Sequence, residues 1–248
     1  ENIRRFLKEI GETRNKGGVH ATWRPIRGML NWYETEYEPA HWSNPTRKVK
    51  IPKPRAIAIP GISMEDFGKL ISVCEQGGAV GQRDKAMLFI LLDTCARAEE
   101  FLNLNVGDVD LISGDVLIRM GKGEKPRYVK IALKAKRELR KYLRTREGLK
   151  KSDPLFVKEH GGGGRFTYNG LESLLRWRSG QAGIERPGMH DIRRAGALEL
   201  LRNVADISFI SKYLGHENIE VTMRYLAITP DDIQRMHSKA SPVDNAHF

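Results

Sequence analysis

Residues 207–225 read ISFISKYLGHENIEVTMRY, and this stretch carries the clearest structural pattern in the chain. Three apolar residues recur in it at helical spacing: Ile207, Ile210 and Leu214. Gly215 then stands where a helix commonly ends in a left-handed residue. The sequence therefore predicts a helix that ends before Gly215, with His216 presented by the turn. The simpler interpretation of such a histidine is a favourable contact with the negative end of the helix dipole.

A second short helix is expected to carry Tyr225. Asn218 can cap this helix, and Tyr225 comes near its far end, nine residues after His216. A tyrosine in such a place is usually a half-buried packing residue. The position of Tyr225 alone therefore gives it no chemical role.

Upstream, the segment 189–194 reads MHDIRR. His190 and Arg193 are three residues apart, so they share one face of a helix. Such a pair arises easily by chance in a chain with many basic residues. Taken alone, it is interpreted as surface charge.

Arg97 follows a strongly apolar stretch, residues 84–92, which is predicted to be a buried helix. Its backbone is therefore expected to be firmly held. The simple interpretation is a structural ion pair with Glu99 or Glu100. A held arginine that a carboxylate orients is also how a phosphate clamp is built.

Lys122 stands between two glycines in a predicted hairpin turn. The flanking segments 115–120 and 127–132 alternate and are rich in β-forming residues, so they are predicted to be strands. A lysine at a hairpin tip is most simply a solvated turn residue. Lys125 lies in the same turn.

The remaining pattern is helical, which makes the expected fold class mainly α with one small β-hairpin. Ser63 is a predicted N-cap, with Asp66 at the capping-box distance. Further helices are expected from this cap to about residue 73, over 133–144, as a series of short helices over 168–226, and from Pro230 with Thr229 as its cap.

The chain is expected to contain two domains. Residues 1–45 are predicted to be helical, because Ile3, Phe6, Leu7 and Ile10 fall at helical spacing and a second helix is expected over 22–36, which tolerates Pro25 only in its first turn. Residues 46–61 are predicted to be an extended basic linker, rich in proline, and residues 62–248 to be the second domain. The linker suits a phosphate backbone as well as it suits a solvated tether. The candidate DNA-binding cations are Arg24, Arg27, Arg47, Lys48, Lys50 and Lys53.

The chain has 248 residues and a formal net charge of +11, which favours a polyanionic partner such as nucleic acid. Its two cysteines, Cys74 and Cys95, cannot form a disulfide framework or a four-cysteine zinc site, so we expect a reducing, cytoplasmic setting. We identify no signal peptide and no apolar run long enough to cross a bilayer. Because Glu1 already lies inside an amphipathic pattern, we expect the natural chain to begin earlier.

Each of these residues is weak evidence alone, but their order along the chain makes them specific as a set. An arginine, a hairpin lysine, His-x-x-Arg, Leu-Gly-His and then a tyrosine, all in one basic chain, resemble the tyrosine recombinases, or phage integrase family. The resemblance runs from about Ile62 to Ala227. Residues 1–45 resemble the end of that family's helical core-binding domain. Cys95-Ala96 and Arg194 depart from the usual residues without replacing a catalytic one.

The resemblance implies a site-specific recombinase that cuts and rejoins DNA through a 3′-phosphotyrosyl link, without metal or ATP. The matching catalytic positions are Arg97, Lys122, His190, Arg193, His216 and Tyr225, with Glu100 supporting the first arginine. We find no carboxylate cluster or Cys/His spacing that would hold a metal. The expected partner is double-stranded DNA, bound by a homotetramer on paired sites, in the cytoplasm with the nucleoid and with no membrane partner.

Two other functions remain compatible with the residues. One is a nicking and resealing enzyme resembling the type IB topoisomerases, and the other is a silent DNA-binding protein of the same fold. The last helix is expected to dock either on a neighbouring protomer or on its own domain.

Overall fold

The computed structural model describes residues 2–51, 61–119, 126–158, 163–203, 206–216, 218–226, 230–241 and 243. The chain divides into two compact units, residues 1–57 and 58–248, which are considered separately below. No helix among the described residues is long and apolar enough to cross a membrane.

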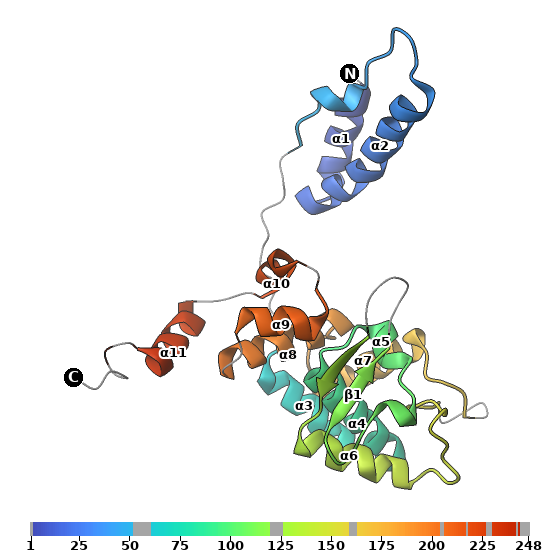
Figure 1. The fold of residues 1–248 in the computed structure, drawn as a ribbon, viewed down its shortest axis with the longest axis vertical. Coiled ribbons are helices and arrows are strands. Elements are labelled where there is room, and N and C mark those ends of the chain that lie inside the picture. The colour runs from blue at the N-terminus through green and yellow to red at the C-terminus, as the bar shows by residue number, and fades with distance from the viewer. Residues whose placement is uncertain are drawn as a thin grey trace. The chain divides into compact units, whose positions relative to one another are not determined.

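The first unit is built on two packed helices, α1 (Asn2–Thr13) and α2 (Lys16–Tyr37) (Figure 1). The prediction that the second helix begins near residue 22 was wrong. The side chain of Asn15 accepts a hydrogen bond from the amide of Gly18, and this cap starts α2 six residues earlier. Pro25 therefore lies in the helix interior, where it cannot donate a backbone hydrogen bond.

The start of the predicted linker is folded rather than extended. A short 3-10 helix, η1 (Pro45–Lys48), follows the N-cap Asn44, and the side chain of Asn44 is buried. The carbonyl of Lys48 accepts a 2.8 Å hydrogen bond from the Arg4 guanidinium. Residues 45–48 thus belong to the first unit, because their polar groups find partners on α1 and α2. Residues 52–60, the rest of the proline-rich stretch, lie outside the described residues.

The second unit is centred on α4 (Gly78–Thr94), which contacts α3 (Met64–Glu75), α6 (Leu133–Arg144) and α8 (Met189–Asn203). The amide of Asp66 donates to the Ser63 hydroxyl at 3.0 Å, which confirms the predicted cap of α3. The apolar run predicted over residues 84–92 is the buried middle of α4. The bounds predicted for α6 are also confirmed.

The strands β1 (Asp115–Ile118) and β2 (Arg127–Lys130) pair antiparallel, with Ile118 opposite Arg127. Both are shorter than the predicted strands. Along β2, Arg127 and Val129 point toward the protein, whereas Tyr128 and Lys130 are exposed. The hairpin turn, residues 120–125, lies outside the described residues.

The remaining elements confirm the mainly helical prediction. They are α5 (Ala98–Leu102), the 3-10 helix η2 (Val106–Asp108), α7 (Tyr168–Ala182), α9 (Ile207–Leu214), α10 (Ile219–Tyr225) and α11 (Pro230–Ala240). Gly215 ends α9 with φ +70°, as its pattern predicted. The amide of Glu220 donates to the Asn218 side chain at 2.8 Å, which confirms that cap.

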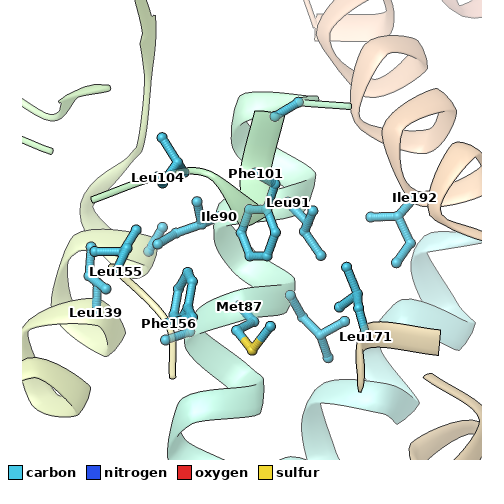
Figure 2. Packing of buried hydrophobic residues seen from close by; sticks show 14 of the residues in the cluster. Met87, Ile90, Leu91, Phe101, Leu104, Leu139, Leu155, Phe156, Leu171 and Ile192 are labelled. Carbon is cyan, nitrogen blue, oxygen red and sulfur yellow. The ribbon is translucent and has the colours of Figure 1, made fainter. Parts of the chain in front are cut away.

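The larger of two apolar clusters among the described residues of the second unit surrounds α4 (Figure 2). Met87, Ile90 and Leu91 of α4 meet Phe101 on one side and Ile192 on another. A smaller cluster around Ala197, Ile210 and Leu214 joins α8 to α9 and also includes Cys95. These two clusters fix the C-terminal end of α4 against α8 and α9, where the candidate catalytic residues converge.

The last helix, α11, contacts α8 of its own chain. The Arg202 guanidinium donates to the Asp232 carboxylate at 2.6 Å, and Met236 packs against the smaller apolar cluster. The helix was expected to dock either on a neighbouring protomer or on its own domain. In the structure of this single chain it docks on its own domain. Thr229, its predicted cap, lies outside the described residues.

Candidate active site

The candidate site begins where α4 ends. Cys95 terminates α4 in a left-handed conformation, φ +48°, and Arg97 then forms the N-cap of α5. The Arg97 amide donates to Glu100 Oε2 at 2.7 Å, and its Nη1 donates to Oε1 at 3.0 Å. The predicted partner of Arg97 was Glu99 or Glu100, and in the structure it is Glu100. Since 35% of the Arg97 side chain is exposed, its guanidinium remains accessible from outside.

Arg193 reaches the same place from α8. Its side chain is only 3% exposed, and its Nη1 donates to the Cys95 carbonyl at 2.6 Å. Its Nη2 donates to the Leu214 carbonyl at 2.8 Å. Nη1 also lies 3.8 Å from Glu100 Oε2. Arg193 therefore joins the ends of α4 and α9 and lies beside the carboxylate that orients Arg97.

Arg127 is a third cation at this carboxylate, and the sequence reasoning missed it. Its Nη1 and Nη2 donate to Glu100 Oε1 and Oε2 at 2.8 and 2.9 Å, a two-pronged contact. Its Nε donates to the Tyr213 carbonyl at 3.0 Å. One signal was available: the alternation of β2 puts this arginine on the same inward face as Val129, and an inward arginine needs a carboxylate partner.

The charge of Glu100 is set by these neighbours. Burial by itself raises the pKa of its carboxyl, but the hydrogen bonds from Arg127 and the Arg97 amide, and both positive charges, outweigh burial. The net result is a pKa below the ordinary value. Glu100 is therefore a permanent anion at neutral pH, placed to hold several guanidinium groups close together against their mutual repulsion.

His216 follows Gly215 at the end of α9 and is only partly exposed. Its Nε2 lies 3.4 Å from Arg193 Nη2, and its Nδ1 lies 2.8 Å from the Thr222 hydroxyl. Burial first, and then the charges of Arg193 and Arg97, lower its pKa to about 4. A guanidinium can only donate, so this arrangement fits a neutral ring that accepts at Nε2 and donates from Nδ1 to Thr222.

Thr222 links His216 to the helix of the candidate nucleophile. It is fully buried on α10, and Tyr225, three residues later, is the last residue of that helix. The amide of Leu226 donates to the Thr222 carbonyl, and the Leu226 side chain is buried. The backbone of Tyr225 is therefore held near the site from both sides. Its side chain lies outside what the structure describes.

Of the two remaining predicted catalytic residues, His190 and Lys122, the structure describes only His190. His190 lies in the first turn of α8 and is exposed, whereas Arg193 on the same helix is buried. Lys122 and its alternative Lys125 lie outside the described residues. No cluster of three potential metal ligands occurs among the residues whose placement is described.

The candidate DNA-binding cations belong mostly to the first unit. Arg24 and Arg27 are exposed on α2, Lys48 is exposed at the end of η1, and Lys50 is exposed two residues further on. Arg47 is exposed too, although it pairs with Glu34 at 3.0 Å. Lys53 lies outside the described residues.

Residues 62–231 match the model of the phage integrase family. The whole chain aligns with 82% of tyrosine recombinase XerC of Oceanobacillus iheyensis, at 32% identity. Tyrosine recombinase XerD of Listeria monocytogenes is 30% identical over 88% of this chain and 73% of its own length.

Solved structures give the same result. XerA recombinase is 25% identical and covers 97% of this chain and 82% of its own, with a TM-score of 0.66. A post-cleavage complex of XerH recombinase with its difH DNA covers 97% of this chain and 71% of its own, with a TM-score of 0.76. At 23% identity, the XerH likeness shows the fold alone.

Proposed function

Because this chain belongs to the phage integrase family and is a tyrosine recombinase, we propose that Tyr225 is the nucleophile of its DNA strand exchange. In this proposal the phenol attacks the scissile phosphorus, a 3′-phosphotyrosyl link forms, and the 5′-hydroxyl leaves. A second 5′-hydroxyl then attacks that link and releases Tyr225. The observation that carries the assignment is the hydrogen bond from His216 to Thr222, which joins the helix of Tyr225 to the arginine cluster.

Arg97 and Arg193 are proposed to hold the non-bridging oxygens of the phosphate. Enzymes lower barriers by about 8–23 kcal/mol, and one preorganised donor contributes roughly 2.7–4 kcal/mol. A single arginine is therefore not enough, whereas several fixed donors are. The contacts of Arg193 with Cys95 and Leu214, and of Arg97 with Glu100, support the proposal because they fix both groups before DNA arrives.

The proton transfers are assigned from the family resemblance. Tyrosine has a pKa of about 10 in water, so a base must take its proton at neutral pH. His190 is the proposed acceptor. His216 is proposed as a further donor to the phosphate, a role in which its proton moves to Nε2 and its Nδ1 accepts from the Thr222 hydroxyl once DNA is bound. Lys122 is the proposed acid that protonates the leaving oxygen, with Lys125 as the alternative in the same turn.

A nicked suicide substrate, which traps the covalent intermediate, tests the nucleophile. Tyr225→Phe should bind this DNA with unchanged affinity and form no adduct that survives denaturing electrophoresis. Tyr128→Phe is the matched control, because Tyr128 is 70% exposed on β2 and loses the same hydroxyl group. A persistent adduct in the Tyr225 variant would refute the assignment. The same adduct missing from the Tyr128 variant would show that the assay reports folding instead.

The leaving-group acid has a separate test. A substrate with sulfur in place of the bridging 5′-oxygen has a leaving group that needs no proton. Cleavage by Lys122→Ala should be slow on normal DNA and restored on the sulfur substrate. Restoration of Lys125→Ala instead would transfer the role to that residue.

We further propose that the first unit and its continuation bind the DNA backbone through Arg24, Arg27, Arg47, Lys48, Lys50 and Lys53, as part of a homotetramer on paired sites. Removing one such phosphate contact should reduce the steepness of the salt dependence of binding by about one. If α11 exchanges its cis contact with α8 for a neighbouring protomer in the tetramer, deleting residues 228–248 should weaken tetramer assembly more than DNA binding by one protomer; equal effects on both would argue for docking in cis alone. We place this reaction on nucleoid DNA in the cytoplasm.

A further inference from the structure

Arg127 is held on all sides at the candidate site. Each of its guanidinium nitrogens donates to a described partner: two to the Glu100 carboxylate and one to the Tyr213 carbonyl. Its side chain is 14% exposed, against 35% for Arg97. Three of its five N–H groups are engaged and its side chain is mostly buried, so its role is better sought in the groups that it holds than in a phosphate contact.

The contacts of Glu100 show what that role is. An ionised carboxylate has about four lone-pair positions. Oε1 accepts from Arg97 Nη1 and Arg127 Nη1, and Oε2 accepts from the Arg97 amide and Arg127 Nη2. These four bonds saturate the carboxylate. While Arg127 is in place, Glu100 can therefore take only one N–H from the Arg97 side chain.

Without Arg127, the same carboxylate would have two vacant acceptor positions beside Arg97. A guanidinium and a carboxylate prefer to pair by two parallel hydrogen bonds. Arg97, whose Nη2 now donates to the Gly215 carbonyl at 3.4 Å, would then be drawn flat against Glu100, with both terminal nitrogens on the carboxylate. The consequence would be a phosphate-binding arginine neutralised by its own supporting carboxylate.

A second set of contacts extends this effect to the rest of the site. Arg127 also packs over Gly215: a Cβ atom there would lie 3.0 Å from Arg127 Nη1. Through the Tyr213 carbonyl and this close approach, Arg127 fixes the end of α9. That end supplies the Leu214 carbonyl that holds Arg193. Strand β2 is thereby joined to α5 through Glu100 and to α9 through Tyr213.

We propose that Arg127 is a positioning residue of the recombinase: it saturates Glu100 so that the Arg97 guanidinium is not locked in a two-pronged pair with that carboxylate, and it fixes the α9 end beside Arg193. This inference rests on the proposed function of Arg97 and Arg193 as the phosphate clamp. Arg127 itself is not assigned a contact with DNA.

The test compares Arg127→Gln and Arg127→Lys with a matched control, Arg119→Gln. Arg119 lies just after β1 on the same hairpin and donates to the buried Asp108 carboxylate, not to Glu100, at 2.6–2.7 Å. Each variant is measured for thermal unfolding, for DNA affinity, and for single-turnover cleavage of the suicide substrate at saturating enzyme. Saturation separates the cleavage step from binding.

For Arg127→Gln we expect cleavage to fall by about 10- to 100-fold, the range known for groups that orient the ligands of catalytic metal ions. DNA affinity should change less than twofold. Arg127→Lys keeps the charge but not the two-pronged contact, so it should recover only part of the rate. Arg119→Gln should cleave at the rate of the unchanged protein even if its unfolding temperature falls as far.

Modified substrates distinguish positioning of the arginines from a general loss of structure. A methylphosphonate at the scissile position removes one charged oxygen and so reduces the need for the arginine clamp. The deficit of Arg127→Gln should shrink on this substrate and should persist on the 5′-sulfur substrate, which replaces only the leaving-group acid. Equal deficits on all substrates would refute the inference, as would rescue by sulfur alone or equal rates for the Gln variants of Arg127 and Arg119. Adduct formation by the unchanged protein tests the proposed function separately.

Discussion

Replacing Glu100 with glutamine is the most demanding test of the arginine cluster. The change keeps the shape of the side chain and removes one negative charge. The Glu100 side chain is 7% exposed in the unchanged protein. It lies between Arg127, which is 14% exposed, and Arg193, which is 3% exposed. The amide nitrogen of a glutamine would also point a donor at one of these guanidinium groups. The variant thus leaves buried cations facing each other without a counter-charge.

The expected cost follows from burial. Removing one partner from a buried ion pair destabilises a protein by about 3–5 kcal/mol, because the remaining charge is left without compensation. Arg97 adds little to this figure, since its partly exposed guanidinium is screened by water. For a domain of this size each kcal/mol lowers the unfolding temperature by roughly 2–4 °C. We therefore expect Glu100→Gln to unfold roughly 6–20 °C lower.

The pH dependence has a definite sign. The pKa of Glu100 is lowered in the folded protein, so the unfolded chain takes up its proton first as the pH falls. Its stabilisation is complete above the ordinary value of 4.5 and disappears as the pH falls through the folded value. The difference in unfolding free energy between the two proteins should therefore be constant near neutral pH and shrink in acid.

Denaturant unfolding at several pH values, together with single-turnover cleavage, measures both effects. Glu138→Gln is the control: Glu138 is also a buried carboxylate with cationic partners, but it lies on α6. Both variants should be less stable, and only Glu100→Gln should also cleave slowly. A loss below 1 kcal/mol for Glu100→Gln, or a difference that grows in acid, would refute the reasoning about this cluster.

Three further predictions concern the surroundings of the site. Thr222→Val should slow cleavage and cost about 1–3 kcal/mol, because the imidazole donor of His216 loses its partner; Thr222→Ser should restore both, and a fully active valine variant would contradict this. The ring protons of His216, followed by NMR, should titrate with a midpoint at about 4 rather than at the ordinary 6.5; since the folded state resists protonation, this group contributes stability above pH 6.5 that is lost as the pH falls toward 4. Asp84→Asn should destabilise the protein by about 3–5 kcal/mol without slowing cleavage at saturating DNA, because Asp84 and Arg178 form a pair that is 1% exposed on both sides, within the helical core; a selective loss of cleavage would show that this pair affects the site.

The sequence predicted best those elements whose signals are local. The Ser63 and Asn218 caps, the left-handed Gly215 and the bounds of α6 each depend on residues within a few positions of one another. The start of α2 was predicted wrongly because two local signals conflicted. Asn15 is as local a cap as Ser63, but Pro25 carried the stronger signal and placed the helix start too late. A proline inside a helix is tolerated when the flanking turns are stabilised otherwise.

The organisation of the site around Glu100 could not be predicted in this way. Its bonds to Arg97 join residues three positions apart, and the sequence suggested them. Its bonds to Arg127 join positions 27 apart, across a hairpin. Nothing near either residue indicates the other, because the contact exists only once β2 has packed against α5 and α9. What the sequence does show is an imbalance: a carboxylate beside one arginine has acceptor capacity to spare, and an arginine on the inward face of a strand has donors to satisfy. Pairing the unsatisfied donors of one predicted element with the unsatisfied acceptors of another would have predicted the contact between Glu100 and Arg127. The same spare acceptor capacity of Glu100 is why Arg127 is needed: without it, Glu100 would bind the Arg97 guanidinium by two hydrogen bonds.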